Sequence, residues 1–172
     1  IKIKNTINLI HKLSNFDNPI ILRPHHEENI NTWRELIKKF NYKNIKVDNS
    51  TKISDVLEKS HIIFHCDSSV AIDSQIRGLP TFSYQSNDLD HDFLHHIPIK
   101  ASCIINQKNL KNLNNAKELL DFYKSKNNRD EILKDYFNIT EYSKDPTFSI
   151  SEEIGMLMNQ TKENPYFKFI LN

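Results

Sequence analysis

Glycine is scarce in this chain, with 2 glycines among 172 residues. Loops such as GxGxxG and the P-loop need several glycines, because their backbone must approach a phosphate closely. The sequence therefore excludes the nicotinamide dehydrogenases with that fingerprint and the P-loop kinases and ATPases. If the chain binds a phosphate, we expect hydroxyl groups at a helix start to hold it.

Cysteines, long apolar runs and an excess of one charge are also lacking. The two cysteines, Cys66 and Cys103, form no disulfide scaffold and lie in apolar runs typical of buried strands. No run reaches about 18 apolar residues, and the charged start does not resemble a signal peptide. Lys and Arg number 23 against 22 Asp and Glu, so a formal net charge of +1 predicts no nucleic-acid partner.

The apolar residues follow two spacings, one helical and one continuous. Ile3, Ile7, Ile10 and Leu13 predict a helix over 3–14. Further helices are expected over 29–40, 54–60 and 70–77, and strands over 19–22, 45–47, 61–66 and 80–84. Helices that alternate with continuous apolar strands predict an α/β fold, a doubly wound Rossmann-like parallel sheet with helices on both faces.

The last third of the chain is less regular. Residues 85–98 are polar and rich in histidine, and residues 103–105 predict a last short strand. We assign residues 1–160 to one domain and residues 161–172 to a C-terminal aromatic tail that packs against this domain or another. Because the chain starts at Ile1 inside a helical pattern, we expect it to be part of a longer protein. Helices are also predicted over 108–113, 116–126, 129–137 and 150–158.

Polar side chains follow three of the predicted strands, in loops over 23–28, 65–69 and 84–92, where an open parallel sheet binds its ligands. Ser68 and Ser69 stand at a helix start, whose free N–H groups and dipole favour an anion. Arg23 can fork a phosphate or carboxylate, and His25 can donate a proton. Asp73 can accept hydrogen bonds from ribose hydroxyls. The alternatives are plain helix capping by Asp67 or Ser68, a solvated loop at residues 23–26, and an exposed acid at Asp73.

Metal and thiol chemistry are disfavoured. His91, His95 and His96 invite a metal site, but neither HExxH nor CxxC is present, so we predict none. Cys66 as a nucleophile beside His65 is disfavoured, because adjacent strand residues point to opposite faces.

Two segments carry a family resemblance, IILRPHHEENINTWREL and ISDVLEKSHIIFHCDSSVAIDSQIRGLPTFSY. They resemble the C-terminal half of bacterial surface carbohydrate biosynthesis proteins, which are similar to GT-B glycosyltransferases, Kdo transferases and bacterial sialyltransferases. The family pattern is Arg-Pro-His-Pro after one strand, His-x-x-Ser/Thr-Ser/Thr after another, an acidic residue and Gly-x-Pro. Here His26 replaces the second Pro and Asp73 the usual Glu; the matching residues are Arg23, Pro24, His25, His65, Ser68, Ser69, Gly78 and Pro80.

The resemblance implies a function in surface polysaccharide or capsule biosynthesis. The substrate would be a CMP-, CDP- or UDP-linked nucleotide sugar, with no cofactor. His25 would be catalytic, stabilising charge on the leaving phosphate, and the remaining binding residues would be Arg23, His26, His65, Ser68, Ser69 and Asp73. An absent N-terminal domain would bind a glycan or lipid-linked acceptor. The full-length protein would be cytoplasmic, at the inner face of the membrane by peripheral association.

Other interpretations stay open. HCDSSVAIDSQIRGLPTFSY is also similar to CDP-glycerol glycerophosphotransferases of teichoic acid synthesis. UDP-GlcNAc 2-epimerases are a weaker match, because they have a Gly-rich turn where Ser68 and Ser69 stand. A non-catalytic binding or assembly domain is the remaining alternative, and its aromatic tail would contact a partner.

Overall fold

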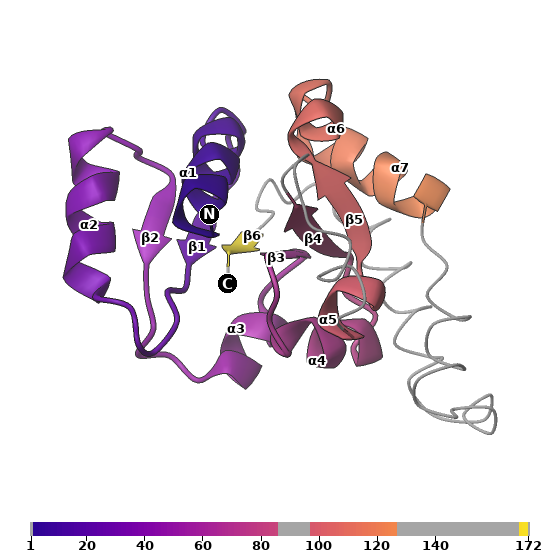
Figure 1. Ribbon diagram of the computed structural model, residues 1–172, viewed down its shortest axis with the longest axis horizontal. Coiled ribbons are helices and arrows are strands. Elements are labelled where there is room, and N and C mark those ends of the chain that lie inside the picture. Colours follow the sequence, from indigo (N-terminus) through magenta and orange to yellow (C-terminus); the bar gives the residue numbers. More distant parts are fainter. Residues whose placement is uncertain (1, 86–96, 127–168, 172) are drawn as a thin grey trace.

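Thirteen helices and strands are defined in the computed structural model, which describes residues 2–85, 97–126 and 169–171 (Figure 1). The expected helices over 129–137 and 150–158, the three histidines of residues 91–96, Tyr166 and Phe167 lie outside these residues. In chain order the elements are α1 (Lys2–Leu13), β1 (Ile20–Leu22), α2 (Ile30–Lys39), β2 (Ile45–Val47), α3 (Ile53–Glu58), β3 (Ile62–His65), α4 (Val70–Ile76), β4 (Thr81–Gln85), α5 (Ile97–Lys100), β5 (Cys103–Asn106), α6 (Gln107–Lys111), α7 (Ala116–Lys126) and β6 (Phe169–Leu171).

The six strands form one parallel sheet in the order β2-β1-β6-β3-β4-β5 (Figure 1). All four residues of β3 and all five of β4 are buried, as expected for parallel strands covered on both faces. The α/β class and the parallel sheet predicted from the sequence are therefore confirmed, and the arrangement is compatible with a Rossmann-like fold.

Alternating residues of one strand reach two separate cores. Ile62 and Phe64 belong to a large cluster with α1, α2, α6 and α7, whereas Ile63 packs with Val56 and Val70 from α3 and α4. Neighbouring strand residues point to opposite faces, so these helices cover the two sides of the sheet. The connection from β1 to β2 and the connection from β2 to β3 lead in opposite directions across the sheet. Because connections between parallel strands are right-handed, the helices of these two connections lie on opposite faces.

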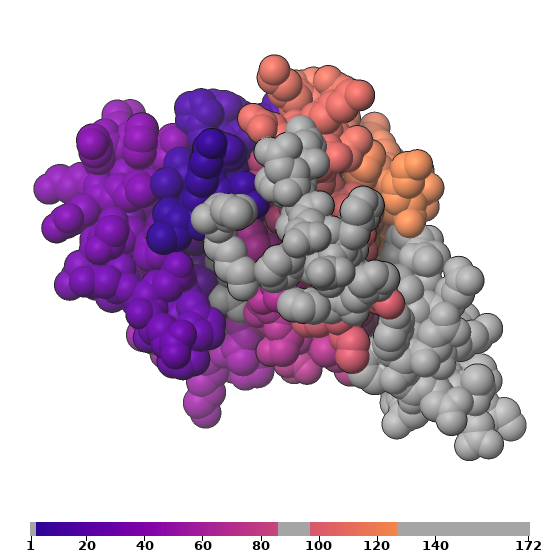
Figure 2. Space-filling model, viewed as in Figure 1, coloured from indigo at the N-terminus to yellow at the C-terminus, as the bar shows by residue number. Residues whose placement is uncertain are grey.

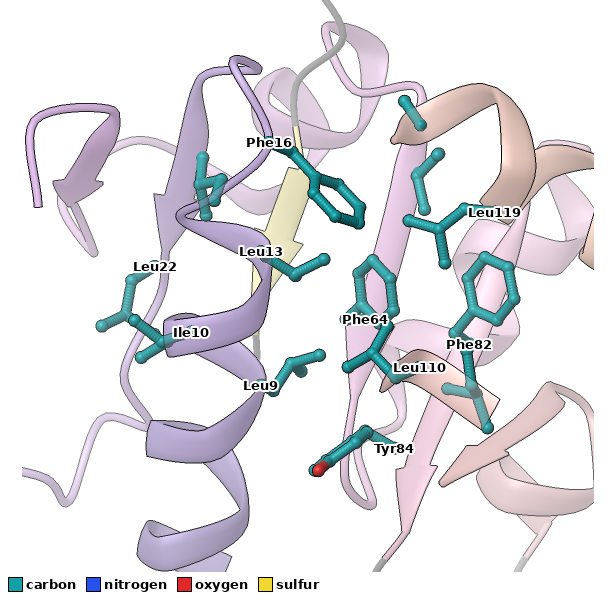
Figure 3. Packing of buried hydrophobic residues seen from close by; sticks show 14 of the residues in the cluster. Leu9, Ile10, Leu13, Phe16, Leu22, Phe64, Phe82, Tyr84, Leu110 and Leu119 are labelled. Atoms are coloured by element: carbon teal, nitrogen blue, oxygen red, sulfur yellow. The ribbon is translucent and has the colours of Figure 1, made fainter. Parts of the chain in front are cut away.

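Helix α1 packs over the larger core. Leu13, on the apolar face predicted from the sequence, and Leu9, which was not part of that prediction, lie close to the aromatic side chains of the central strands (Figure 3). Phe64 stacks on Phe82 with 5.0 Å between ring centroids, and both rings are fully buried. Burial and ring contact of this kind stabilise a domain by several kcal/mol, at about 1.5–3 kcal/mol per large apolar side chain. Helix α1 and residues 97–126 lie on different parts of the face seen in Figure 2.

Two elements were not predicted from the sequence. Helix α5 begins at Ile97, in a segment expected to be irregular up to residue 98. Strand β6 comes from the segment that we assigned to a tail, and it pairs with β1 on one side and β3 on the other. The division after residue 160 therefore does not separate a tail from the sheet.

Helix ends follow the expected residue chemistry. Asn29 caps α2, since its side-chain oxygen accepts a hydrogen bond of 2.9 Å from the Asn31 amide. Gly78 follows α4 with φ 77°, the left-handed region that favours glycine at this position. No helix within the described ranges is long and apolar enough to span a bilayer.

Candidate functional site

A cavity of about 730 Å³ opens at the carboxyl ends of β1, β2 and β3. The sheet order places β1 and β3 on either side of β6, so the chain reverses its direction across the sheet here. Open parallel sheets bind ligands at such a switch point. The lining residues are Thr6, Arg23, Pro24, His25, His26, Glu27, Glu28, Asn49, Ile53, Cys66, Asp67, Ser68, Ser69, Val70 and Asp73.

Most of the predicted site residues meet in this cavity. Arg23, His25 and His26 come from the segment after β1, and Ser68, Ser69 and Asp73 come from the turn after β3 and from α4. These two segments are more than forty residues apart in the sequence, and the parallel sheet brings their strands to one edge.

The Arg23 guanidinium is anchored at the cavity wall. Its Nη1 donates a hydrogen bond of 2.7 Å to the Thr51 carbonyl, in the segment after β2. This bond uses one of five guanidinium N–H donors. The fixed orientation gives the cavity a permanent positive charge at a defined place, which suits a phosphate or carboxylate ligand.

The segment that anchors Arg23 is itself held by Asp48. The carboxylate accepts hydrogen bonds from the amide and hydroxyl of Ser50 and from the amide and hydroxyl of Thr51, at 2.8–3.3 Å. Lys46 Nζ lies 3.3 Å from Oδ2. Hydrogen bonds from the Ser50 side chain and backbone hold the pKa of Asp48 far below its usual range. Asp48 therefore stays charged and orders the loop that carries Asn49 into the cavity.

His25 has a defined pair of contacts through one ring nitrogen. Nδ1 lies 3.4 Å from the Glu27 amide nitrogen and 3.6 Å from a Glu27 carboxylate oxygen. A neutral ring accepts from the amide at Nδ1, and a charged ring pairs with the carboxylate; in both states Nε2 carries a hydrogen. His25 can therefore donate a hydrogen bond through Nε2 in either form. His26 lies beside it, with 4.1 Å between ring centroids.

The turn after β3 supplies hydroxyl groups. Ser68 Oγ accepts a hydrogen bond of 3.4 Å from the Val70 amide, but the N-cap position of α4 belongs to Ser69 rather than to Asp67 or Ser68. Ser69 is exposed at the start of α4, and its side chain makes no capping hydrogen bond. Both serines line the cavity, and Asp73, also exposed, lies one turn further along α4.

His65 is a correction to the expected ligand set. Its side chain is 1% exposed and does not line the cavity. Nδ1 lies 3.3 Å from the Ser68 amide nitrogen, and Nε2 lies 2.7 Å from Ser102 Oγ. Burial lowers the pKa of His65 to about 4, against a smaller opposite effect of Asp67. The ring is therefore neutral near pH 7 and contacts protein groups through both nitrogens.

Carboxylates outnumber fixed cations in the cavity. Among its described lining residues Arg23 is the only arginine or lysine, against four carboxylates from Glu27, Glu28, Asp67 and Asp73. Glu28 accepts a hydrogen bond of 2.8 Å from the His25 amide, so this carboxylate shapes the loop. The site thus combines a small cationic and hydroxyl region with carboxylates that can accept hydrogen bonds from ligand hydroxyls.

Several lining residues carry no sequence signal that we used. Thr6 reaches the cavity from α1, where its hydroxyl lies 3.8 Å from Cys66 Sγ. Asn49 lies two residues after β2, so the rule that ligands bind beyond the ends of parallel strands also points to this residue. Within the described part of the chain, no group of three or more His, Cys, Asp or Glu side chains is placed to hold a metal ion.

No protein-family model matches this chain, and comparisons with curated proteins and with solved structures also gave no match.

Proposed function

We propose that this chain is the donor-binding domain of a glycosyltransferase-like protein of surface polysaccharide biosynthesis, with a nucleotide sugar as its substrate. The observation that carries the proposal is the meeting of Arg23, His25, Ser68, Ser69 and Asp73 in one cavity at the switch point of the sheet. A nucleotide sugar offers phosphate oxygens to the first four and ribose or sugar hydroxyls to the carboxylate.

The two chemical regions of the cavity match the two parts of such a ligand. Arg23, anchored on Thr51, would bind a phosphate oxygen with its remaining N–H groups, and the serine hydroxyls would bind another. Asp73 and Asp67 would accept hydrogen bonds from ligand hydroxyls. Hydroxyls carry no charge, so the two carboxylates do not repel them. Because Arg23 is the only arginine or lysine among the described lining residues, we expect a ligand with few phosphates to bind best.

His25 would act on the leaving group. In glycosyl transfer the bond between the sugar and the phosphate oxygen breaks, and negative charge develops on the phosphate. A donor already directed at that oxygen stabilises this charge without further reorganisation. The Nε2–H of His25 is available in both protonation states, so it can donate to the phosphate or transfer a proton to it. The acceptor and its base would come from a domain outside this chain.

Isothermal titration calorimetry tests the proposal with CMP, CDP and UDP as ligands. We expect one of them to bind, and the double variant Ser68→Ala, Ser69→Ala to weaken that binding at least about tenfold, because each lost hydrogen bond to a charged group is worth about 1.5–3 kcal/mol. Ser125→Ala, an exposed serine on α7, is the control and should bind like the parent chain. Absence of binding by all three nucleotides, or equal binding by the double variant, contradicts the proposal. A strong preference for CDP-glycerol would favour the glycerophosphotransferase instead.

A further inference from the structure

His65 and the cavity turn belong to one series of linked hydrogen bonds, which is buried at its centre. The Ser68 amide lies 3.3 Å from His65 Nδ1, His65 Nε2 lies 2.7 Å from Ser102 Oγ, and Ser102 Oγ lies 2.7 Å from the Pro98 carbonyl oxygen. The series links the turn after β3 to the end of α5, in front of β5.

The two ends of this series fix the position of every hydrogen in it. The Ser68 amide can only donate, so His65 Nδ1 accepts. The Pro98 carbonyl can only accept, so Ser102 donates to it and accepts from His65 Nε2. The ring is therefore the neutral tautomer with its hydrogen on Nε2, and this arrangement satisfies both nitrogens of a side chain that is 1% exposed.

A second buried side chain holds the same turn from the next strand. Gln85, at the end of β4, donates a hydrogen bond of 2.6 Å from Nε2 to the Cys66 carbonyl, and the same nitrogen contacts Ser83 Oγ. The backbone from Cys66 to Ser68 is thus fastened at two points by groups that do not line the cavity. Protein groups that are held in place by such supporting contacts bind a ligand more tightly, because they lose less conformational freedom on binding.

We infer that His65 is a positioning residue, which directs the hydroxyls of Ser68 and Ser69 into the cavity by accepting the Ser68 amide at Nδ1. This inference rests on the proposed nucleotide site. It replaces direct ligand contact by His65 with an indirect role that runs through one backbone amide.

Two substitutions of His65 test the contributions of the two ring nitrogens separately. His65→Asn keeps an amide oxygen near the place of Nδ1 and loses the group at Nε2. His65→Gln keeps an amide nitrogen near the place of Nε2 and loses the acceptor for Ser68. We expect His65→Asn to bind the nucleotide identified above within about threefold of the parent chain, and His65→Gln to bind it at least about tenfold more weakly. Equal or tighter binding by His65→Gln would overturn the inference.

Nuclear magnetic resonance supplies readouts that need no ligand. In the parent chain we expect nitrogen shifts of an unprotonated Nδ1 and a protonated Nε2. The Ser68 amide should exchange with solvent at least about tenfold faster in His65→Gln than in His65→Asn. The opposite tautomer, or equal exchange in the two variants, would refute the positioning role. If the tautomer and exchange are as expected but no nucleotide binds the parent chain, the proposed function fails and the arrangement of the turn stands.

Ser102, at the other end of this series of hydrogen bonds, allows a test with two matched variants. Ser102→Ala removes the acceptor for His65 Nε2, whereas Ser102→Thr keeps a hydroxyl there. We expect faster Ser68 exchange in Ser102→Ala and a rate near that of the parent chain in Ser102→Thr. The same rate in both variants would contradict a link between Ser102 and the turn.

Discussion

Acid should destabilise this protein through His65 from about pH 6.5 downward, before most carboxylates begin to titrate. Burial lowers the pKa of His65 from 6.5 to about 4. The unfolded chain therefore binds a proton near pH 6.5, whereas the folded chain binds it only near pH 4. Because the unfolded state holds more protons between these values, the free energy of unfolding falls as the pH falls through that window. At about 1.4 kcal/mol for each pKa unit, the loss amounts to about 3 kcal/mol.

The variant His65→Asn isolates this contribution, since asparagine does not titrate. Near pH 7 we expect the variant to be about 1–3 kcal/mol less stable than the parent chain, because Ser102 loses a buried partner. As the pH is lowered to about 4, the parent chain should lose about 3 kcal/mol more than the variant, so the difference between them closes or changes sign. Urea unfolding followed by circular dichroism at several pH values measures both free energies.

Phe82→Leu is the matched control, because it weakens the neighbouring strand without removing a titrating group. It should lower the free energy of unfolding by a similar amount at every pH, parallel to the parent chain. If His65→Asn also runs parallel to the parent chain between about pH 6.5 and pH 4, then His65 is not a buried neutral histidine and the argument is wrong.

Three further substitutions test other parts of the structure by urea unfolding. Asp48→Asn should lower the free energy of unfolding by about 1–3 kcal/mol near pH 7, because an amide nitrogen cannot accept a hydrogen bond from the Thr51 hydroxyl. Its control, Lys46→Ala, should lower it by less than about 1 kcal/mol. Equal losses in the two variants would show that the Asp48 hydrogen bonds do not hold this loop. Gly78→Ala should lower the free energy of unfolding by about 1–2 kcal/mol, because a φ of 77° disfavours a residue with a Cβ atom. Its control, Arg77→Ala, has a φ of −73° and should change this free energy by less than about 0.5 kcal/mol. An unchanged stability of Gly78→Ala would refute the strain expected at this position. Ile170→Pro should lower the free energy of unfolding by more than about 3 kcal/mol, because β6 pairs with a strand on each side and proline cannot donate a backbone hydrogen bond. Ile170→Val, its control, should be tolerated. A proline variant of unchanged stability would mean that β6 does not pair with β1 and β3.

The position of β6 changes how the binding-module alternative can be tested. Phe169 belongs to a strand between β1 and β3, so Phe169→Asp would place a charge within the sheet. Loss of an assembly in that variant would report on folding rather than on a contact with a partner. Phe169 is therefore weaker evidence for docking than the sequence indicated.

Local patterns were enough for most of the fold. Helix α2 was predictable because Trp33 and Ile37 lie on one face, and β3 because three apolar residues, Ile62, Ile63 and Phe64, follow one another. Helix α5 has only four residues, and its second is Pro98, so no period could be recognised. Strand β6 has three residues, and neither its length nor its composition distinguishes it from an aromatic tail.

The candidate site was partly predictable for the same reason. The rule that ligands bind after parallel strands located Arg23, His25 and the Ser68–Ser69 turn, because it depends only on strand ends and connectivity. It could not tell that His65, the last residue of β3, points into the protein. It also missed Thr6, which reaches the cavity from a helix that has no motif of its own.

The sequence by itself determined most of the helices and strands, with α5 and β6 as exceptions, and which polar groups stand at the strand ends, because these depend on residues close together in the chain. Its 2 glycines also excluded a glycine-rich phosphate loop. Only the tertiary structure decided that β6 enters between β1 and β3, that Arg23 is anchored on Thr51 in the loop that Asp48 holds, and that His65 supports the turn. Each of these depends on hydrogen bonds or burial that arise once distant segments pack together, and no local pattern encodes them.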